Sequence, residues 1–396
     1  NFSMVRMQTS WIVPKLIYAK GIEEQTGAKV IAVTWNENPL LTKFFSSFGI
    51  SHLALNTLIK TDFLAFIKAA GKTFGLAVCG GNGERIKRMK ACGIAVGRGI
   101  YEDILRTSSL STVRTVRNKV CLKKPFHLLW MFYALEDYLK KHTPQVFIND
   151  DFAYHEGILI KLFLKKGAKV YASSNVGERE TFLNKDGEVV RLMENGHSKI
   201  KEYFKNVPEE AEQWTDLFLE ERFLGKNGRE IDRGAFSGKN VISRKELTEQ
   251  YKINPNKKNV VIMAHTFTDA VFNYGNYYFR DYYDWVEETL KLAQNITSVN
   301  WILKPHPTRS AYNESEDSIE QLFEKYKKEL IEKYQDYLDN LSNPEVFNNL
   351  DTISSVGIAE FPNYEFSDGT NMIAVGDCAV CVNPSASELA SIAIAA

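Results

Sequence analysis

Residues 300–312, NWILKPHPTRSAY, run from apolar side chains into a histidine that lies between two prolines and near two cations. The apolar part predicts a short buried strand. Each proline keeps the residue before it out of helical geometry, so the strand should end in an extended, rigid turn. Lys304, His306 and Arg309 would then lie at the carboxyl end of that strand, where they suit a phosphate. A turn with incidental basic residues fits this stretch equally well.

A second candidate anion site follows residues 378–385, CAVCVNPS, which also predict a buried strand. Ser385 and Glu388 fit the capping box S-x-x-E, so a helix should begin there. The free N–H groups and the dipole at such a helix start attract anions, and Glu388 could accept hydrogen bonds from ribose hydroxyls. An ordinary capped helix is the alternative. His265 is a second histidine that follows a predicted strand, at 259–265.

Titratable residues also gather where the strand predicted at 145–150 ends: Asp150, Asp151, His155 and Glu156. Carboxylates at such a position can act as acid, base or metal ligands. Their spacing matches no standard ligand set, and the pair Cys378 and Cys381 has no second pair to complete a metal site. We therefore expect no metal.

Strands alternate with helices along the chain, which predicts βαβ units and a mostly parallel sheet. The runs predicted as strands are 29–35, 74–80, 145–150, 168–174, 259–265, 300–306, 356–362 and 378–385. The runs predicted as helices are 124–142, 157–167, 282–294 and 318–341. A polar connector at about 200–258 divides the pattern, so we expect an α/β fold of two Rossmann-like domains facing a central cleft. Their predicted extents are 1–235 and 236–396.

Composition narrows the class of protein. The chain has 396 residues, with 49 Lys and Arg balanced by 49 Asp and Glu, so its net charge does not point to nucleic acid or to a membrane. No apolar run reaches the length of a membrane span, and five scattered cysteines are typical of a reducing compartment. We expect a soluble cytoplasmic protein. The closing segment SASELASIAIAA opens a helix that ends with no C-terminal cap and no closing turn, which predicts that more polypeptide follows.

Several stretches, taken in order, resemble the retaining β-Kdo glycosyltransferases of bacterial surface-polysaccharide assembly, which build O-antigen and capsule. Those stretches are 92–106, 155–171, 219–226, 259–270, 280–307 and 383–389. The most specific element is the combination of AHTFTDA with DYYDW and WILKPHP. KPHP alone is a weaker signal, because other capsule transferases share it.

The resemblance implies a GT-B fold, with CMP-Kdo bound as the donor by the C-terminal domain and with no cofactor or metal. It implies that Lys304 and His306 hold the CMP phosphate. Phosphate and ribose would be bound by Ser385, Ser387 and Glu388. The acceptor would be a lipid-linked polysaccharide at the inner face of the inner membrane, reached with other modules of the polypeptide or of an assembly complex.

For catalysis, the resemblance implies that Asp232, in the connector, is a carboxylate nucleophile. Glu156 and His265 would be acid/base or orienting groups. Kdo carries its own carboxylate, so its site needs further cations, for which the candidates are Arg98, Arg106 and Arg309. Asp151 is added as a substrate contact. A sialyl- or polyol-phosphate transferase on the same fold, or a non-catalytic scaffold domain, stays open as an alternative.

Overall fold

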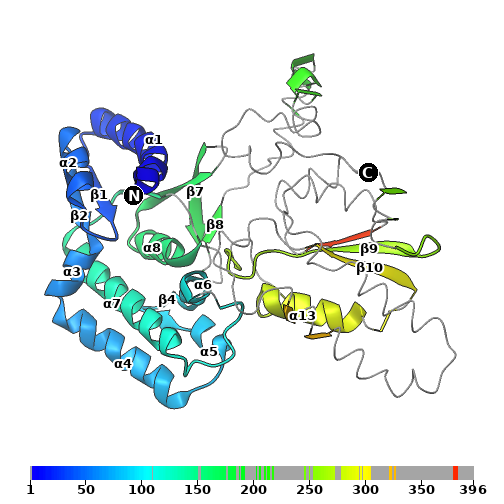
Figure 1. Ribbon diagram of the computed structural model, residues 1–396. Helices are drawn as coiled ribbons and strands as arrows, with labels where there is room; N and C mark the ends of the chain where they lie inside the picture. Colours follow the sequence, from blue (N-terminus) through cyan, green and yellow to red (C-terminus); the bar gives the residue numbers. More distant parts are fainter. Residues whose placement is uncertain are drawn as a thin grey trace. The chain divides into compact units, whose positions relative to one another are not determined.

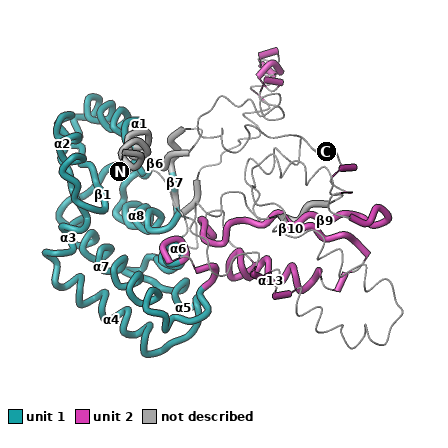
Figure 2. The backbone as a smooth tube through the Cα atoms, viewed as in Figure 1, with its two compact units in different colours: residues 1–104, 113–193 teal, residues 105–112, 194–396 magenta. Residues whose placement is uncertain are grey.

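The computed structural model is a mixed α/β protein (Figure 1). It describes residues 2–108, 110–149, 153–174, 177–183, 187, 189–191, 253–272, 278–293, 295–296, 298–304, 321–322, 325–326 and 378–381, with isolated residues between 202 and 249. The chain divides into two compact units, shown in Figure 2. Unit 1 comprises residues 1–104 and 113–193, and unit 2 comprises residues 105–112 and 194–396.

The described helices of unit 1 are α1 (Phe2–Thr26), α2 (Pro39–Ser47), α3 (Leu55–Thr61), α4 (Phe63–Cys79), α5 (Gly83–Lys87), α7 (Lys119–Lys141) and α8 (Tyr154–Lys165). Its described strands are β1 (Ile31–Thr34), β2 (Ser51–Ala54), β3 (Lys90–Ala91), β4 (Ile94–Ala95), β5 (Val146–Asn149), β6 (Lys169–Ser174), β7 (Gly177–Leu183) and β8 (Val189–Arg191). Helix α6 (Gly97–Ser108) contains the boundary after Ile104. Unit 2 contributes β9 (Lys258–Met263), α13 (Tyr282–Ala293), β10 (Val299–Lys304) and β11 (Cys378–Cys381).

In unit 2, three strands form a parallel sheet in the order β10-β9-β11 (Figure 1, where β11 is red). The register pairs Met263 with Lys304 on one side and with Cys381 on the other. Val261, Ile262 and Ile302 are buried, as the apolar runs require. The strands predicted at 259–265, 300–306 and 378–385 are thus confirmed within a few residues, and so is the helix predicted at 282–294. The three carboxyl ends lie side by side.

A buried amide pair holds the opposite end of the same sheet. Asn259 and Asn300 face each other in the register of β9 and β10, and both are almost fully buried. The Asn300 Nδ2 donates to Asn259 Oδ1 at 2.6 Å and to the Asn254 carbonyl oxygen at 2.8 Å. A shift of the strands by one residue would break these hydrogen bonds. The shift is unfavourable because it would leave buried amides without partners.

The strands of unit 1 form smaller sheets. β1 pairs with β2 in parallel, and β5 pairs with β6 in parallel, which confirms the strands predicted at 29–35, 145–150 and 168–174. The order β5-β6-β7-β8 continues with antiparallel pairs, so this sheet is mixed. The sequence analysis does not anticipate the β7–β8 hairpin, although Gly187, at φ 74, follows an aspartate in a typical hairpin turn pair.

The strand predicted at 74–80 is wrong, because these residues belong to α4 almost to their end. Asp62 caps this helix by accepting from the Ala65 backbone N–H at 2.9 Å. Ala65, Ala69 and Leu76 repeat at helical spacing and are buried, which gives α4 one packed side. That side packs along α7, whose predicted range 124–142 is confirmed. The β-branched and aromatic content of FGLAVC was therefore overridden by the cap and the helical period.

Other predictions fall outside the described residues. These are the strand at 356–362, most of the helix at 318–341 and the domain boundary after residue 235. The helix predicted at 157–167 is confirmed as α8. Among the described helices, none combines the length and the apolar character that a bilayer crossing requires.

The amide pair generates the first prediction. Replacing Asn300 by Ala leaves Asn259 and the Asn254 carbonyl short of a donor, so unit 2 should lose about 1–3 kcal/mol of stability. Hydrogen exchange measured by mass spectrometry should then become faster in the peptides of β9 and β10. The control is Asn256→Ala, an exposed turn residue before β9. Equal exchange in the two variants would contradict the role of the pair.

Candidate functional site

The strongest cluster of titratable groups in the described part of unit 1 lies where α8 begins. His155 and Glu156 occupy the first turn of α8, which follows β5. Asp103 comes from α6, and Trp35 directly follows β1. Three separate segments therefore meet at one imidazole.

His155 lies between two carboxylates. Its Nδ1 is 2.7 Å from Asp103 Oδ1, and its Nε2 is 2.9 Å from Glu156 Oε1. The Trp35 ring packs perpendicular to the imidazole with the ring centroids 4.0 Å apart. The side chains of His155 and Glu156 are each 25% exposed, whereas that of Asp103 is 4% exposed. Asp103 is thus the buried anchor, and the other two side chains are open to a ligand.

The backbone that carries His155 is held in an unusual conformation. Tyr154 has a φ of 53, in the left-handed region that non-glycine residues seldom adopt. The Glu102 carboxylate accepts a hydrogen bond from the Tyr154 N–H at 2.9 Å. A Cβ atom at Gly99 would lie 2.4 Å from the Tyr154 carbonyl oxygen, so only glycine lets α6 approach this closely. Such a conformation costs about 1–3 kcal/mol and is often found at functional sites.

The charges in this cluster support one another. Burial alone would lower the pKa of His155, but the hydrogen bonds and charges of Asp103 and Glu156 outweigh it and raise the pKa to about 9. Burial would raise the pKa of Asp103, but His155 and Lys124 hold it below its usual value. The Lys124 Nζ lies 3.1 Å from Asp103 Oδ2. At neutral pH His155 is therefore an imidazolium.

An imidazolium is not a base, so His155 is suited to orientation and charge stabilisation rather than to proton removal. Glu156 is suited to accept a hydrogen bond or a proton from a hydroxyl group, as a general base does. Together with the Trp35 ring, these side chains offer the polar and apolar contacts that a sugar makes. Its chemistry fits a polar, hydroxyl-rich ligand.

In unit 2, the loop after β9 carries His265. Its Nδ1 is 3.1 Å from the Thr266 carbonyl oxygen, so Nδ1 carries a proton and donates this hydrogen bond. The ring stacks on Tyr282 at 4.6 Å between centroids. Two contacts thus fix the His265 ring, two residues beyond the carboxyl end of β9.

The same loop includes Asp269, whose Oδ1 lies 3.8 Å from Arg106 Nη1 in the last turn of α6. Nearby, Thr112 Oγ1 donates to Asp281 Oδ2 at 2.6 Å, and Asp281 also caps α13 by accepting from the Asp284 N–H. These contacts belong to unit 2 and fix the loop that carries His265 and the start of α13.

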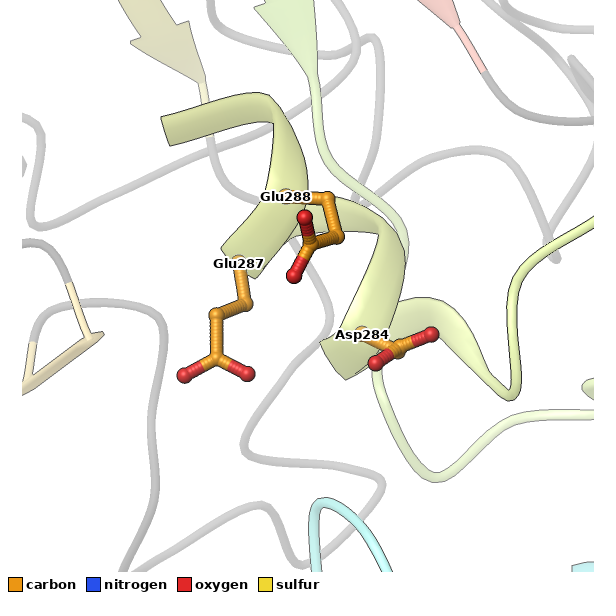
Figure 3. Close-up of side chains that lie close together, drawn as sticks. All are labelled: Asp284, Glu287 and Glu288. Carbon is orange, nitrogen blue, oxygen red and sulfur yellow. The ribbon is translucent and has the colours of Figure 1, made fainter. Parts of the chain in front are cut away.

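Three carboxylates on α13 have oxygens within 4.8 Å of one another: Asp284, Glu287 and Glu288 (Figure 3). Each has its own partner. Asp284 pairs with Arg280 at 2.9 Å, Glu287 accepts from the Tyr326 hydroxyl at 3.0 Å, and Glu288 pairs with Lys291 at 2.7 Å. The group is a network of side-chain contacts on a helix surface, and it gives no argument for a metal ion.

The described residues include five of the predicted site residues. Glu156 and Arg98 lie in unit 1, and Arg106, His265 and Lys304 lie in unit 2. Lys304 is described only as the last residue of β10, and Arg98 is half-buried in the first turn of α6. The remaining predicted site residues lie outside the described residues: Asp151, Asp232, His306, Arg309, Ser385, Ser387 and Glu388.

Sequence reasoning missed Asp103, Glu102 and Trp35. The two acids follow one another in GIYEDIL, a helical run in which the neighbouring apolar residues are all buried. The available signal was an acidic pair within an apolar helical run, because buried carboxylates need hydrogen-bond partners. Trp35 gave no signal beyond its position after a strand.

Comparison of the chain with protein-family models, with curated proteins and with solved structures gives no match.

The second prediction concerns pH. The folded-state pKa of His155, about 9, exceeds the ordinary value of 6.5, so the cluster stabilises the fold fully below pH 6.5. As the pH rises from 6.5 through 9, the unfolded chain releases this proton first and the stabilisation is lost, by up to about 3 kcal/mol. The stability difference between the wild type and His155→Gln should shrink accordingly in urea unfolding.

His142→Gln is the control, since this exposed histidine lies outside the cluster at the end of α7. A wild-type minus His155→Gln difference that stays constant from pH 6.5 to 9 would contradict the charge assignment.

Proposed function

We propose that the chain is a retaining glycosyltransferase of bacterial surface-polysaccharide assembly, with a GT-B fold, that transfers β-Kdo from CMP-Kdo to a glycan acceptor. The proposal of a nucleotide site depends on one observation, the register of β10, β9 and β11. This register aligns Lys304, Met263 and Cys381 at the carboxyl ends of the three strands. The choice of Kdo as the sugar is supported by the resemblance of the sequence stretches described above.

The strand order supports a ligand site at this edge of the sheet. From β9 the chain adds β10 on one side and later β11 on the other, so the direction of addition reverses at β9. Open α/β sheets bind ligands outside the carboxyl ends of the strands at such a switch point. In the sequence, KPHP begins at the end of β10, His265 follows β9 by two residues, and NPSASEL follows β11. Each of these three segments follows a strand of this sheet in the sequence, which supports a ligand site at the carboxyl ends of the strands.

The proposed donor site uses cations in place of a metal. Lys304 and His306 stabilise the CMP phosphate, and Ser385, Ser387 and Glu388 bind phosphate and ribose. CMP is a good leaving group whose negative charge fixed cations can stabilise without a metal ion. The carboxylate of Kdo requires further positive charge, which Arg98, Arg106 and Arg309 are candidates to supply.

The proposed chemistry is a double displacement. A carboxylate oxygen of Asp232 bonds to the anomeric carbon as the bond to the CMP phosphate breaks. The acceptor hydroxyl then displaces Asp232 and gives its proton to a base, so that two inversions produce retention. Glu156 and His265 are the candidate bases, because a carboxylate and an imidazole can each accept a proton and both side chains are partly exposed. Asp151 is proposed as a substrate contact.

Nucleotide binding gives the third prediction. Lys304→Ala and His306→Ala should each weaken CMP binding by about 1–3 kcal/mol, the range for losing a charge-assisted hydrogen bond. Isothermal calorimetry checks this, with Lys291→Ala as a matched control, because Lys291 is paired with Glu288 on the exposed side of α13.

Unchanged CMP affinity in both variants would remove the nucleotide site from this edge. A folded chain that binds no cytidine nucleotide would favour a scaffold domain. Transfer from CMP-sialic acid or CDP-glycerol, but not from CMP-Kdo, would favour another transferase. Activity that is lost with EDTA and restored by Mg²⁺ would contradict metal-free catalysis.

Trapping the intermediate gives the fourth prediction. Asp232→Asn should bind CMP-Kdo nearly normally and lose turnover by several orders of magnitude, because only the covalent step is removed. Wild-type protein given donor without acceptor should gain the mass of one Kdo residue on the peptide that contains Asp232. Asp216→Asn, at an exposed position, is the control. Near-normal turnover in Asp232→Ala would reject this nucleophile and make Glu156 the next carboxylate to test.

A further inference from the structure

Helix α4 exposes an unusual number of large apolar side chains. Phe63, Leu64, Ile67, Phe74 and Val78 are between 49% and 72% exposed, and they define the outer face of α4. Their spacing places them on one side of the helix, opposite the buried side that packs along α7. In Figure 1, α4 lies at the edge of unit 1, with α7 beside it.

This helix is therefore apolar on two opposite sides. A helix that is apolar all round is normally buried in a core or in contact with a membrane. Contiguous exposed apolar residues on a folded protein mark a binding surface. The two glycines on this part of α4, Gly71 and Gly75, have open space around them, so nothing packs against the outer face at these two positions. Some partner should cover it.

The charges near the outer face decide which partner fits. Residues 63–79 contain Lys68 and Lys72 and no acidic residue, and Lys60 precedes the helix. Lys68 pairs with Asp137 of α7 at 3.1 Å, whereas Lys60 and Lys72 are exposed. At the carboxyl end, the Arg85 Nη1 donates to the carbonyl oxygens of Cys79 and Gly80. Asp62 caps the start of α4 and offsets part of this charge, but the basic residues around α4 outnumber it.

We infer that the outer face of α4 docks the protein on the surface of a bilayer that contains anionic lipid. Phenylalanine and leucine side chains on one side of a helix, flanked by lysines, are typical of helices that lie in the membrane interface. The negatively charged headgroups would attract the basic side chains of Lys60, Lys72 and Arg85. A helix of 17 residues is about 25 Å long and would lie along the surface.

This inference goes beyond the proposed function, because it does not depend on which sugar is transferred. It is tested by co-sedimentation of the full chain with two kinds of vesicle. One kind contains equal parts of phosphatidylcholine and phosphatidylglycerol, and the other contains phosphatidylcholine alone. We expect binding to the anionic vesicles, and we expect salt to weaken it.

Two variants examine the two parts of the surface. The Phe63→Ser/Phe74→Ser variant should reduce partitioning at least about tenfold, because it removes two aromatic side chains from contact with lipid. The Lys60→Glu/Lys72→Glu variant should reduce binding to the anionic vesicles by a factor of about ten or more. The matched control is Leu40→Ser, which alters an equally exposed apolar residue on α2. Thermal unfolding verifies that each variant is folded.

The inference is overturned if the wild type binds neither vesicle, or binds both kinds equally. It is also overturned if Phe63→Ser/Phe74→Ser partitions like the wild type, or if Leu40→Ser loses as much. Sedimentation velocity tests the main alternative, in which a second copy of the chain covers the outer face of α4. A wild-type dimer that becomes a monomer in Phe63→Ser/Phe74→Ser, without vesicle binding, would assign the face to a second copy of the chain instead.

Discussion

The hydrogen bond from Asn300 to Asn259 joins two buried amides at the start of neighbouring parallel strands. A slip of one residue would separate these amides and leave buried polar groups without their hydrogen bonds. The same register brings Lys304 level with Met263 at the other end of the strands. The proposed nucleotide site therefore depends on a polar contact at the far end of the sheet.

A second constraint operates in unit 1, where α6 buries both Glu102 and Asp103. Buried carboxylates need hydrogen-bond donors, and these two find them at the start of α8. Glu102 binds the Tyr154 backbone, whereas Asp103 binds the His155 ring. One buried helix turn thus sets both the path of the chain and the charge of the imidazole. Glu156, the candidate base, is oriented in turn by its contact with His155.

Sequence patterns predicted the strands of unit 2 well, because a buried parallel strand is a short apolar run with clear ends. They failed at α4, where the same kind of run belongs to a helix and only Asp62 and the repeated alanines indicate it. They also missed Asp103 and Trp35. These residues meet His155 across long stretches of sequence, so no local period reports the contact. The residues proposed at the strand ends stand out in the sequence because a histidine or a proline follows each run within a few residues, and their roles stay predictions.

The central place of β9 has a consequence for how the protein is made on the ribosome. β10 follows it closely in the sequence, but β11 is translated only after a long intervening stretch. At roughly 5–20 residues per second, the second edge of β9 stays without its partner for several seconds. During that time its unpaired N–H and C=O groups offer a template to neighbouring nascent chains. A polypeptide cut before Cys378 would keep that edge permanently, so such fragments should aggregate.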